Sequence, residues 1–373
     1  MVRRNVVLGG RESVKVAIAQ VSPVYLDRER SIERACETIR EAAAGGAELI
    51  VFPEVWLAGY PYWTEGWDSA LPTWVDGRVR FRDAAVVAPS EDTERIGEAV
   101  REAGAYVAIG CNELDPRPEA NTIYNTLLFF DRDGDLLGRH RKLMPTFVER
   151  IFWGSGDASD LVVFDTDIGR IGGLVCGEHL MTTVRASLIA QGEDLHVAVF
   201  PGSFALHTGP QLEEPDTEGA FWGHASVRAH ALEAGAFVLS ACGYLDQDDV
   251  ADDFPYKGAM NDAYAHGGSS IIAPLGVPLA GPEFGSTILY AECHAWMKKA
   301  WNAIIDTVGH YARPDVLRLS IRTDDGWRTV DSSYSERARR DALRRSAERH
   351  DVDDALVEEL AAELDNRSGA PAA

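Results

Sequence analysis

The sequence changes from apolar to polar within Gly172-Gly173-Leu174-Val175-Cys176-Gly177-Glu178-His179, where a short apolar run ends at a thiol beside a carboxylate. The same pattern occurs in Leu49-Ile50-Val51-Phe52-Pro53-Glu54, where the run ends at a carboxylate. Short apolar runs bounded by Gly, Pro or Asp are typical of buried strands. Because ligands of layered α/β folds lie beyond the carboxyl ends of strands, we expect Glu54 and Cys176 to share one site.

Similar apolar runs recur along the chain and alternate with helical patterns. The runs cover residues 14–19, 49–52, 106–111, 122–130, 171–176, 196–200, 237–242, 270–274 and 287–291. Residues 31–44 place apolar side chains on one helix face, and Gly45-Gly46 predicts the end of that helix. Further helices are expected after Ser90 and over residues 181–191 and 218–234. This alternation predicts an α/β layered fold.

Composition excludes several classes of partner. The 373 residues carry a formal net charge of −23, and 46% of them are hydrophobic, which is enough for a sizeable core. Phosphate binding needs a positive surface, so the acidic balance argues against nucleic acid or an anionic membrane. No run approaches the roughly 18–20 apolar residues of a membrane span.

The five cysteines are widely spaced and odd in number, which fits neither a disulfide framework nor a C-x-x-C metal site. The histidines also lack metal-ligand spacing, so no metal is expected. The first apolar run of the chain is too short for a signal peptide, and we expect a cytoplasmic protein. Core packing is the expected role of Cys36, Cys111, Cys242 and Cys293.

Cys176 needs help to act as a nucleophile, because a free thiol has a pKa near 8.5 and is mostly protonated at neutral pH. Glu54 can accept the thiol proton, and Lys142, in the basic segment 140–146, can supply positive charge where negative charge develops. Such a site suits a carbon–nitrogen bond with a polarisable carbon, as in a nitrile or an amide.

Glu178 and His179 allow two other interpretations. Glu178 is either a second acid or a hydrogen-bonded structural residue, and we favour the structural role. His179 lies three positions after Cys176, so contact between the two side chains is not excluded. Because Glu54 already supplies a base, we do not assign catalysis to His179.

Three segments carry a resemblance to a known family. The segments are Phe52-Pro53-Glu54 with Gly59-Tyr60-Pro61-Tyr62, Arg141-Lys142-Leu143-Met144-Pro145-Thr146 with Glu149-Arg150 and Trp153-Gly154-Ser155-Gly156-Asp157, and Gly309-His310-Tyr311-Ala312-Arg313-Pro314-Asp315-Val316. Together they resemble the nitrilase (carbon–nitrogen hydrolase) superfamily, and within it the nitrilases that act on organic nitriles. The similarity extends from about residue 14 to about residue 319.

The resemblance implies an αββα sandwich that pairs into an αββα–αββα dimer and assembles further into spiral oligomers or filaments. It implies a Glu54–Lys142–Cys176 triad with Glu149 as an accessory acid, and no metal or organic cofactor. We expect an N-terminal extension over residues 1–13, a hydrolase domain over residues 14–320 and a charged C-terminal tail over residues 321–373. The tail is either a solvated surface or a contact between subunits.

The chain departs from the family pattern directly after the nucleophile, where Gly177 stands in place of the usual Trp or Ala. A missing side chain there widens the pocket or loosens the backbone beside the thiol. Aromatic residues near the motifs predict a wall for an apolar nitrile substituent, with core packing as the alternative. The expected pocket residues are Tyr60, Trp63, Phe147, Trp153, Gly177 and Phe204.

The sequence therefore predicts a nitrilase that converts small-molecule nitriles to carboxylic acids and ammonia through a thioimidate and an acyl-thioester on Cys176. An amidase or carbamoyl hydrolase, or a cyanide-hydrating enzyme, is the alternative within the superfamily. A non-catalytic assembly protein that retains the fold is the alternative from another class.

Overall fold

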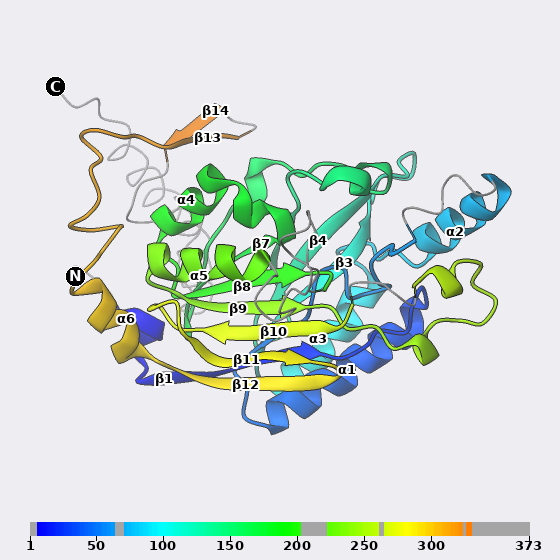
Figure 1. The fold of residues 1–373 in the computed structure, drawn as a ribbon, viewed down its shortest axis with the longest axis horizontal. Helices are drawn as coiled ribbons and strands as arrows, with labels where there is room; N and C mark the ends of the chain where they lie inside the picture. Colours follow the sequence, from blue (N-terminus) through cyan, green and yellow to red (C-terminus); the bar gives the residue numbers. More distant parts are fainter. Residues whose placement is uncertain (1–5, 64–70, 203–221, 261–264, 324–325, 330–373) are drawn as a thin grey trace, which may run out of the picture.

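The computed structural model describes residues 6–63, 71–202, 222–260, 265–323 and 326–329. The predictions for Phe204 and for most of the C-terminal tail fall outside these residues. Two six-stranded sheets lie face to face, with helices on their outer faces (Figure 1). Within the described residues, no helix combines the length and hydrophobicity needed to cross a membrane.

The first sheet has the strand order β12-β1-β2-β3-β4-β5. Strands β1, β2 and β3 run parallel to one another, and the remaining neighbours are antiparallel. The strand bounds are β12 Thr287–His294, β1 Ser13–Gln20, β2 Leu49–Val51, β3 Tyr106–Leu114, β4 Ile123–Phe130 and β5 Leu136–Arg141. Helices α1 (Arg28–Ala44) and α3 (Glu91–Ala103) cover its outer face (Figure 1).

The second sheet has the order β11-β10-β9-β8-β7-β6, again with three parallel strands, β7, β8 and β9, at its centre. Its strand bounds are β11 Pro278–Phe284, β10 Gly267–Ile272, β9 Phe237–Cys242, β8 Leu195–Phe200, β7 Gly169–Val175 and β6 Phe164–Thr166. Helices α4 (Thr182–Gln191) and α5 (Trp222–Ala234) lie against it (Figure 1).

Alternation along the strands builds the layers. In β1, Val16 and Ile18 join the core between the two sheets, whereas Ala17 and Ala19 join the cluster beneath α1 and α3. Successive strand residues point to opposite faces, so a strand buried on both faces reads as one continuous apolar run. The α/β class and the αββα layering predicted from the sequence are thereby confirmed.

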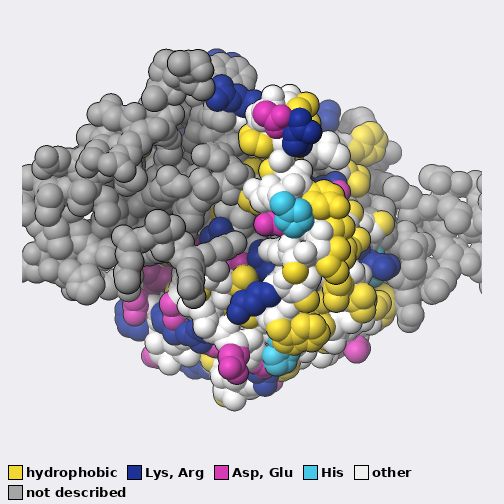
Figure 2. All heavy atoms as spheres, turned by 90° about the vertical axis from the view of Figure 1, so that its left-hand side faces the viewer, with side chains coloured by type: hydrophobic (Ala, Val, Ile, Leu, Met, Phe, Trp, Pro, Cys, Tyr) yellow, Lys and Arg dark blue, Asp and Glu magenta, His cyan; other side chains and the backbone are white. Residues whose placement is uncertain are grey.

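The remaining elements lie at the ends and edges of the sandwich. They are α2 Leu71–Asp83, α6 Ala295–Asn302, the hairpin of β13 Ser320–Thr323 and β14 Gly326–Thr329, and the 3-10 helices η1 Val7–Gly10, η3 Phe147–Ile151, η4 Ala158–Asp160, η5 Cys176–Leu180, η7 Gln247–Asp249 and η8 Lys257–Met260. The end of the molecule that carries α6 shows a band of hydrophobic side chains (Figure 2).

One helix starts earlier than the sequence predicts. Helix α1 begins at Arg28, because the Asp27 side chain accepts a hydrogen bond from the Arg30 backbone N–H and caps the helix. Ser31, the predicted start, is buried inside the helix and its hydroxyl donates to the carbonyl of Val24.

Candidate active site

The fold brings together all four residues predicted to be catalytic. Glu54 follows β2, Lys142 follows β5 and Cys176 opens η5 directly after β7, so the two sheets contribute jointly. A carboxylate oxygen of Glu54, one of Glu149 and the sulfur of Cys176 lie within 4.8 Å of one another. Each of the four residues is at most 4% exposed. We call Glu54, Lys142, Glu149 and Cys176 the cysteine cluster.

Cys176 sits in a sharp turn between strand and 3-10 helix. Its φ of 49° is in the left-handed region, which a residue other than glycine adopts only when its surroundings enforce it. The turn directs the Gly177 backbone N–H toward the Cys176 sulfur, where it lowers the pKa of the thiol and so partly opposes the effect of burial. A strand thus ends by presenting a thiol and a backbone donor at the same point.

Lys142 lies between two carboxylates. Its Nζ donates to Glu54 Oε1 at 3.0 Å and to Glu149 Oε2 at 2.7 Å. The amide of Asn125, on β4, also donates to Glu54 Oε1, at 2.6 Å. Glu54 Oε2 is buried and has no hydrogen-bond partner among the described residues, so it keeps a lone pair available for a proton.

Burial and neighbouring charges set the protonation states of the cluster. Burial raises the pKa of Glu54 to about 7, and the charge of Lys142 only partly opposes that rise. Burial, reinforced by Glu54, also raises the pKa of the Cys176 thiol well above its ordinary value. Burial alone would lower the pKa of Lys142, but the surrounding anions outweigh it and raise that pKa. At neutral pH the site therefore holds a thiol, a cation and a carboxylate close to its titration point.

Glu149 is held by the start of η3 and by an aromatic residue. Its Oε2 accepts the Thr146 backbone N–H at 2.6 Å, which forms a capping box with the Thr146 side chain. Its Oε1 accepts the Tyr60 hydroxyl at 2.9 Å. Both oxygens of Glu149 are therefore fixed, and so is the side of Lys142 that Glu149 contacts.

Glu178 joins the lysine segment to the cysteine turn. Its Oε1 accepts the Leu143 backbone N–H at 2.8 Å, while its Oε2 accepts the Val175 backbone N–H and faces His140 Nε2, both at 2.8 Å. Burial would raise the pKa of Glu178, but His140 and these hydrogen bonds outweigh burial and lower it. The hydrogen-bonded role that the sequence favours for Glu178 agrees with these contacts.

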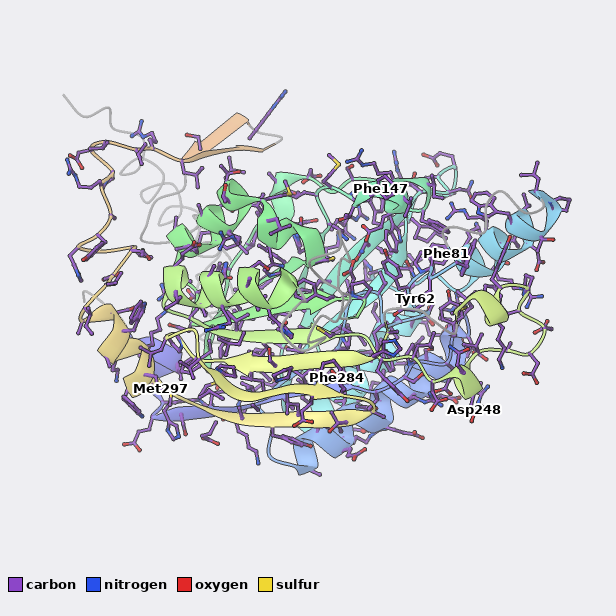
Figure 3. The ribbon with its side chains drawn as sticks, viewed as in Figure 1. Tyr62, Phe81, Phe147, Asp248, Phe284 and Met297 are labelled. Atoms are coloured by element: carbon purple, nitrogen blue, oxygen red, sulfur yellow. The ribbon has the colours of Figure 1, made fainter. Side chains whose placement is uncertain are left out.

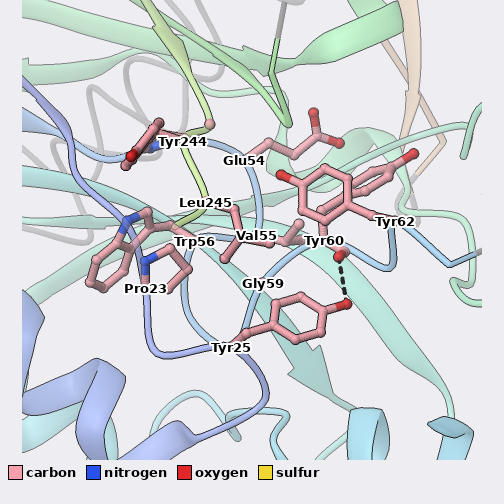
Figure 4. A pocket seen from close by; sticks show the side chains of 12 residues that line it. Pro23, Tyr25, Glu54, Val55, Trp56, Gly59, Tyr60, Tyr62, Tyr244 and Leu245 are labelled. Carbon is pink, nitrogen blue, oxygen red and sulfur yellow. Dashed lines mark hydrogen bonds between the residues drawn. The ribbon is translucent and has the colours of Figure 1, made fainter. Parts of the chain in front are cut away.

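A pocket opens beside Glu54, with an empty volume of about 250 Å³ that includes open solvent (Figure 4). It is lined by Pro23, Tyr25, Pro53, Glu54, Val55, Trp56, Gly59, Tyr60, Tyr62, Gly243, Tyr244 and Leu245. The lining is mainly apolar and aromatic, with one carboxylate.

The predicted pocket residues fall in different places. Tyr60 lines the pocket, and Gly177 adjoins the thiol. Trp63 is 1% exposed and stacks on Tyr256 with ring centroids 5.2 Å apart, inside an aromatic core. Trp153 is also buried and its ring lies 5.5 Å from that of Tyr60. Phe147 is 82% exposed and lies at the surface (Figure 3).

His179 contacts the backbone of Cys176. Its Nδ1 lies 2.9 Å from the Cys176 carbonyl oxygen, and its Nε2 lies 3.0 Å from His196 Nε2. His196 Nδ1 in turn lies 2.7 Å from Glu193 Oε1, and His230 Nε2 lies 2.8 Å from Glu193 Oε2. We call His179, His196, Glu193 and His230 the histidine chain.

Neither the histidine chain nor the contact of Asn125 with Glu54 is predicted from the sequence. Tertiary structure brings Glu193, His196 and His230 within 4.8 Å of one another, although their spacing along the chain gives no metal-binding pattern. The available signal is His196 itself, a polar residue inside the apolar run 195–200, since a buried imidazole requires partners.

The carbon-nitrogen hydrolase family model matches residues 15–302. Nitrilase 3 of an unknown prokaryotic organism is 37% identical over 87% of this chain and 93% of its own length. Nitrilase 2 of Arabidopsis thaliana is 37% identical over 83% of this chain and 88% of its own, and the aliphatic nitrilase of Sinorhizobium fredii is 37% identical over 82% and 95%.

Solved structures agree on the fold. Saccharomyces cerevisiae Nit3, a member of branch 10 of the nitrilase superfamily, has a TM-score of 0.62 at 20% identity and covers 83% of this chain and 99% of its own. The family model, the relatives and the αββα sandwich converge on one assignment. The chain belongs to the carbon–nitrogen hydrolase family, and within that family to the nitrilases.

Proposed function

We propose that this hydrolase converts organic nitriles to carboxylic acids and ammonia, with Cys176 as the nucleophile. The observation that carries the proposal is the cysteine cluster, in which a buried thiol lies beside Glu54, whose pKa is raised to about 7, and beside Lys142. The nitrilases that are identical to it at 37% of the aligned positions support the substrate class.

The first half of the reaction forms a covalent intermediate. Glu54, through its unpartnered Oε2, takes the thiol proton while the sulfur attacks the nitrile carbon. The proton then passes to the nitrile nitrogen, which gives a thioimidate. Lys142 and the Gly177 N–H stabilise the negative charge that develops during attack.

The second half consumes two waters. Glu54 takes a proton from the first water, which adds to the carbon–nitrogen double bond and forms a tetrahedral intermediate. Glu54 returns that proton to the nitrogen, which becomes an amine. The new hydroxyl then gives its proton to Glu54 and, through it, to the nitrogen, so that the carbonyl forms as the C–N bond breaks. Ammonia leaves behind an acyl-thioester. A second water attacks the thioester carbon, the C–S bond breaks, and the acid departs as the thiol is restored. Glu149 keeps Lys142 in place throughout.

The pocket beside Glu54 is the proposed site for the nitrile substituent. Tyr60 and Tyr62 line it, and we propose that Trp63 and Trp153 support this aromatic wall from behind. Gly177 beside the thiol is part of the proposed substrate site. Phe147, exposed at the surface, is not among the lining residues, and Phe204 lies outside the described residues and stays a prediction. A Cβ added at Gly177 would lie 2.9 Å from the Thr146 hydroxyl, which is too close, so any side chain at this position would have to displace Thr146.

We further propose a cytoplasmic homo-oligomer in which αββα subunits pair and then assemble into spirals. Exposed hydrophobic side chains in the described part of the C-terminal region support an association surface: Trp296, Ile304, Tyr311, Val316 and Leu317. Light scattering and negative-stain microscopy test this proposal, and a monomer at micromolar concentration would contradict it.

A substrate panel tests the reaction itself. The purified protein is incubated with aliphatic, aromatic and arylacetonitriles, with cyanide and with the matching amides, while ammonia, acid and amide are measured. We expect ammonia and acid from organic nitriles, and at least ~10⁴-fold less from Cys176→Ala, which removes the nucleophile. Hydrolysis of the amides alone would overturn the proposal in favour of an amidase.

A further inference from the structure

The histidine chain runs from the backbone of the nucleophile into the core of the second sheet. His179 lies in η5, Glu193 precedes β8, His196 lies within β8, and His230 lies on α5. All four residues have 0% exposure. The proposed reaction uses none of these side chains. Burying four titratable groups costs free energy unless hydrogen bonds and opposite charges within the row compensate for the loss of water.

Counting protons along the row gives an unexpected result. The Cys176 carbonyl oxygen at one end accepts only, and an ionised Glu193 carboxylate at the other end also accepts only. Between them are three hydrogen bonds, at 2.9, 3.0 and 2.7 Å, joined by two imidazoles. Three bonds need three protons, whereas two neutral imidazoles carry two. The row therefore holds one additional proton.

The extra proton belongs on His196. Burial would raise the pKa of Glu193, but His196 and His230 outweigh it and lower that pKa, so Glu193 stays ionised. Burial lowers the pKa of His179 well below its ordinary range and that of His230 to about 4. His196 alone lies between an anionic oxygen and a ring that can accept.

Other charged groups near the row are paired. Arg185 of α4 pairs with Glu233 of α5 at 2.6 Å. Lys298 of α6 donates to the Glu193 carbonyl and lies 3.2 Å from Asp194, which also lies 3.6 Å from Arg170 of β7. Glu193 therefore remains the counter-charge that is hydrogen-bonded directly to His196.

At the other end of the row, His179 hydrogen-bonds to the backbone of the Cys176 turn. A trans peptide unit is rigid, so a donor that fixes the Cys176 carbonyl also fixes the Gly177 N–H on the opposite side of the same unit. That N–H faces the sulfur. A hydrogen-bonded carbonyl also polarises its peptide and makes the N–H a stronger donor.

We propose that the histidine chain is a proton-bearing positioning device, in which His179 orients and polarises the Cys176–Gly177 peptide and His196 is held as an imidazolium by Glu193. His179 and His196 are then positioning residues. The inference rests on the proposed function only in taking Cys176 as the nucleophile. The 2.7 and 2.8 Å contacts of Glu193 are hydrogen-bond lengths, whereas two ligands of one zinc ion at 2.0–2.1 Å lie about 3.3 Å apart.

Two substitutions at one position separate orientation from polarisation. His179→Asn puts an amide N–H where imidazole Nδ1 was, which retains the bond to the Cys176 carbonyl but loses His196. His179→Leu loses both. For kcat we expect a fall of about 10-fold for Asn and about 100-fold for Leu, with KM changed less than about 3-fold. His310→Asn, at an exposed histidine outside the row, is the matched control and leaves kcat unchanged.

Alkylation of Cys176 by iodoacetamide gives a readout that needs no nitrile turnover. A weaker Gly177 donor stabilises the thiolate less, so the alkylation profile of His179→Leu moves about one pH unit higher, with Asn in between. If the wild-type protein is folded but hydrolyses no nitrile, and the His179→Leu profile is still displaced from the wild-type profile, the proposed function is overturned and the positioning role is supported. Equal profiles and equal kcat for all three proteins would overturn the positioning role.

Nitrogen-15 NMR of the histidines in the unmodified protein tests the proton itself and does not depend on any variant folding. One imidazolium with both nitrogens protonated is expected at pH 8, and Glu193→Gln abolishes it. Spectra with only neutral rings at pH 8, or stoichiometric zinc in the purified protein, would overturn the proposal.

Discussion

The cysteine cluster and the histidine chain lie on either side of the Cys176 turn, and their buried charges are compensated in different ways. In the cysteine cluster one cation serves two carboxylates, and Glu54 keeps one oxygen without a partner among the described residues. In the histidine chain one carboxylate serves two imidazoles, and both of its oxygens are bonded. An incompletely satisfied carboxylate is poised to accept a proton, whereas a satisfied one fixes geometry.

Matched amide substitutions give the largest expected contrast. Glu54→Gln removes the proton acceptor and lowers kcat about 10³-fold, while Glu193→Gln lowers it only about 10-fold. Thermal stability moves the other way, because Glu193→Gln removes a hydrogen-bonded charge and lowers Tm, whereas Glu54→Gln relieves a buried charge. Steady-state kinetics and calorimetry on both variants measure the contrast. Equal losses of kcat would show that Glu54 and Glu193 do not differ in the way proposed.

Lys142→Met measures how much folding free energy is lost when Glu54 and Glu149 stay buried without the cation between them. Leaving a buried ion uncompensated costs about 3–5 kcal/mol, so urea unfolding should show a loss of that size along with loss of turnover. Adding Glu149→Gln in the double variant should recover a large part of the stability and none of the activity. Full additivity of the two stability changes would contradict the coupling seen in the geometry.

The pH dependence follows from Glu54. Its pKa is raised to about 7 and its ionised form is the base, so activity is half-maximal near pH 7, reaches its plateau well above that pH and is lost as pH falls. We expect kcat/KM to drop tenfold per unit below pH 7, and so about 100-fold by pH 5. An acid limb centred near pH 4.5, the ordinary range of a glutamate, would show that burial does not tune this group.

Tyr60→Phe carries the smallest expected effect. It removes one hydrogen bond to Glu149, and hydrogen bonds to charged groups contribute about 1.5–3 kcal/mol, so a loss of roughly 10-fold in kcat is expected. Tyr106→Phe is the control, since its hydroxyl bonds to Asp167 away from the cluster. If kcat fell more for Tyr106→Phe than for Tyr60→Phe, the loss of activity would reflect a less stable fold and not the lost hydrogen bond to Glu149.

The sequence predicted those site residues that interrupt a pattern. Glu54 and Cys176 each end an apolar run, and strand ends meet at one edge of the fold, so their proximity could be anticipated. The layers were predictable for the same reason, because alternating runs and helices admit few packings. The resemblance to nitrilases supplied Glu149, because the T-x-x-E spacing from Thr146 marks the start of a helix and not an acid at the site.

The rest depends on contacts between distant segments. Asn125 lies inside a run that reads as a buried strand, and only the pairing of β4 with β5, which ends beside Lys142, shows that its amide reaches Glu54. Glu193 and His230 come from different elements and meet only after α5 packs on the second sheet. Their proximity is a property of packing, and no spacing along the chain encodes it.

The pairing of β12 with β1 has a consequence for how the protein forms. These strands come from opposite ends of the hydrolase domain and pair along the whole of β1, from Ser13 with His294 to Gln20 with Thr287. The first sheet is therefore incomplete until the last strand of the sandwich has been synthesised, long after Cys176. Pairing between such distant segments slows folding. A nascent chain therefore carries Cys176 in an unassembled site. The rate at which Cys176 becomes protected from alkylation then measures how fast β12 pairs with β1.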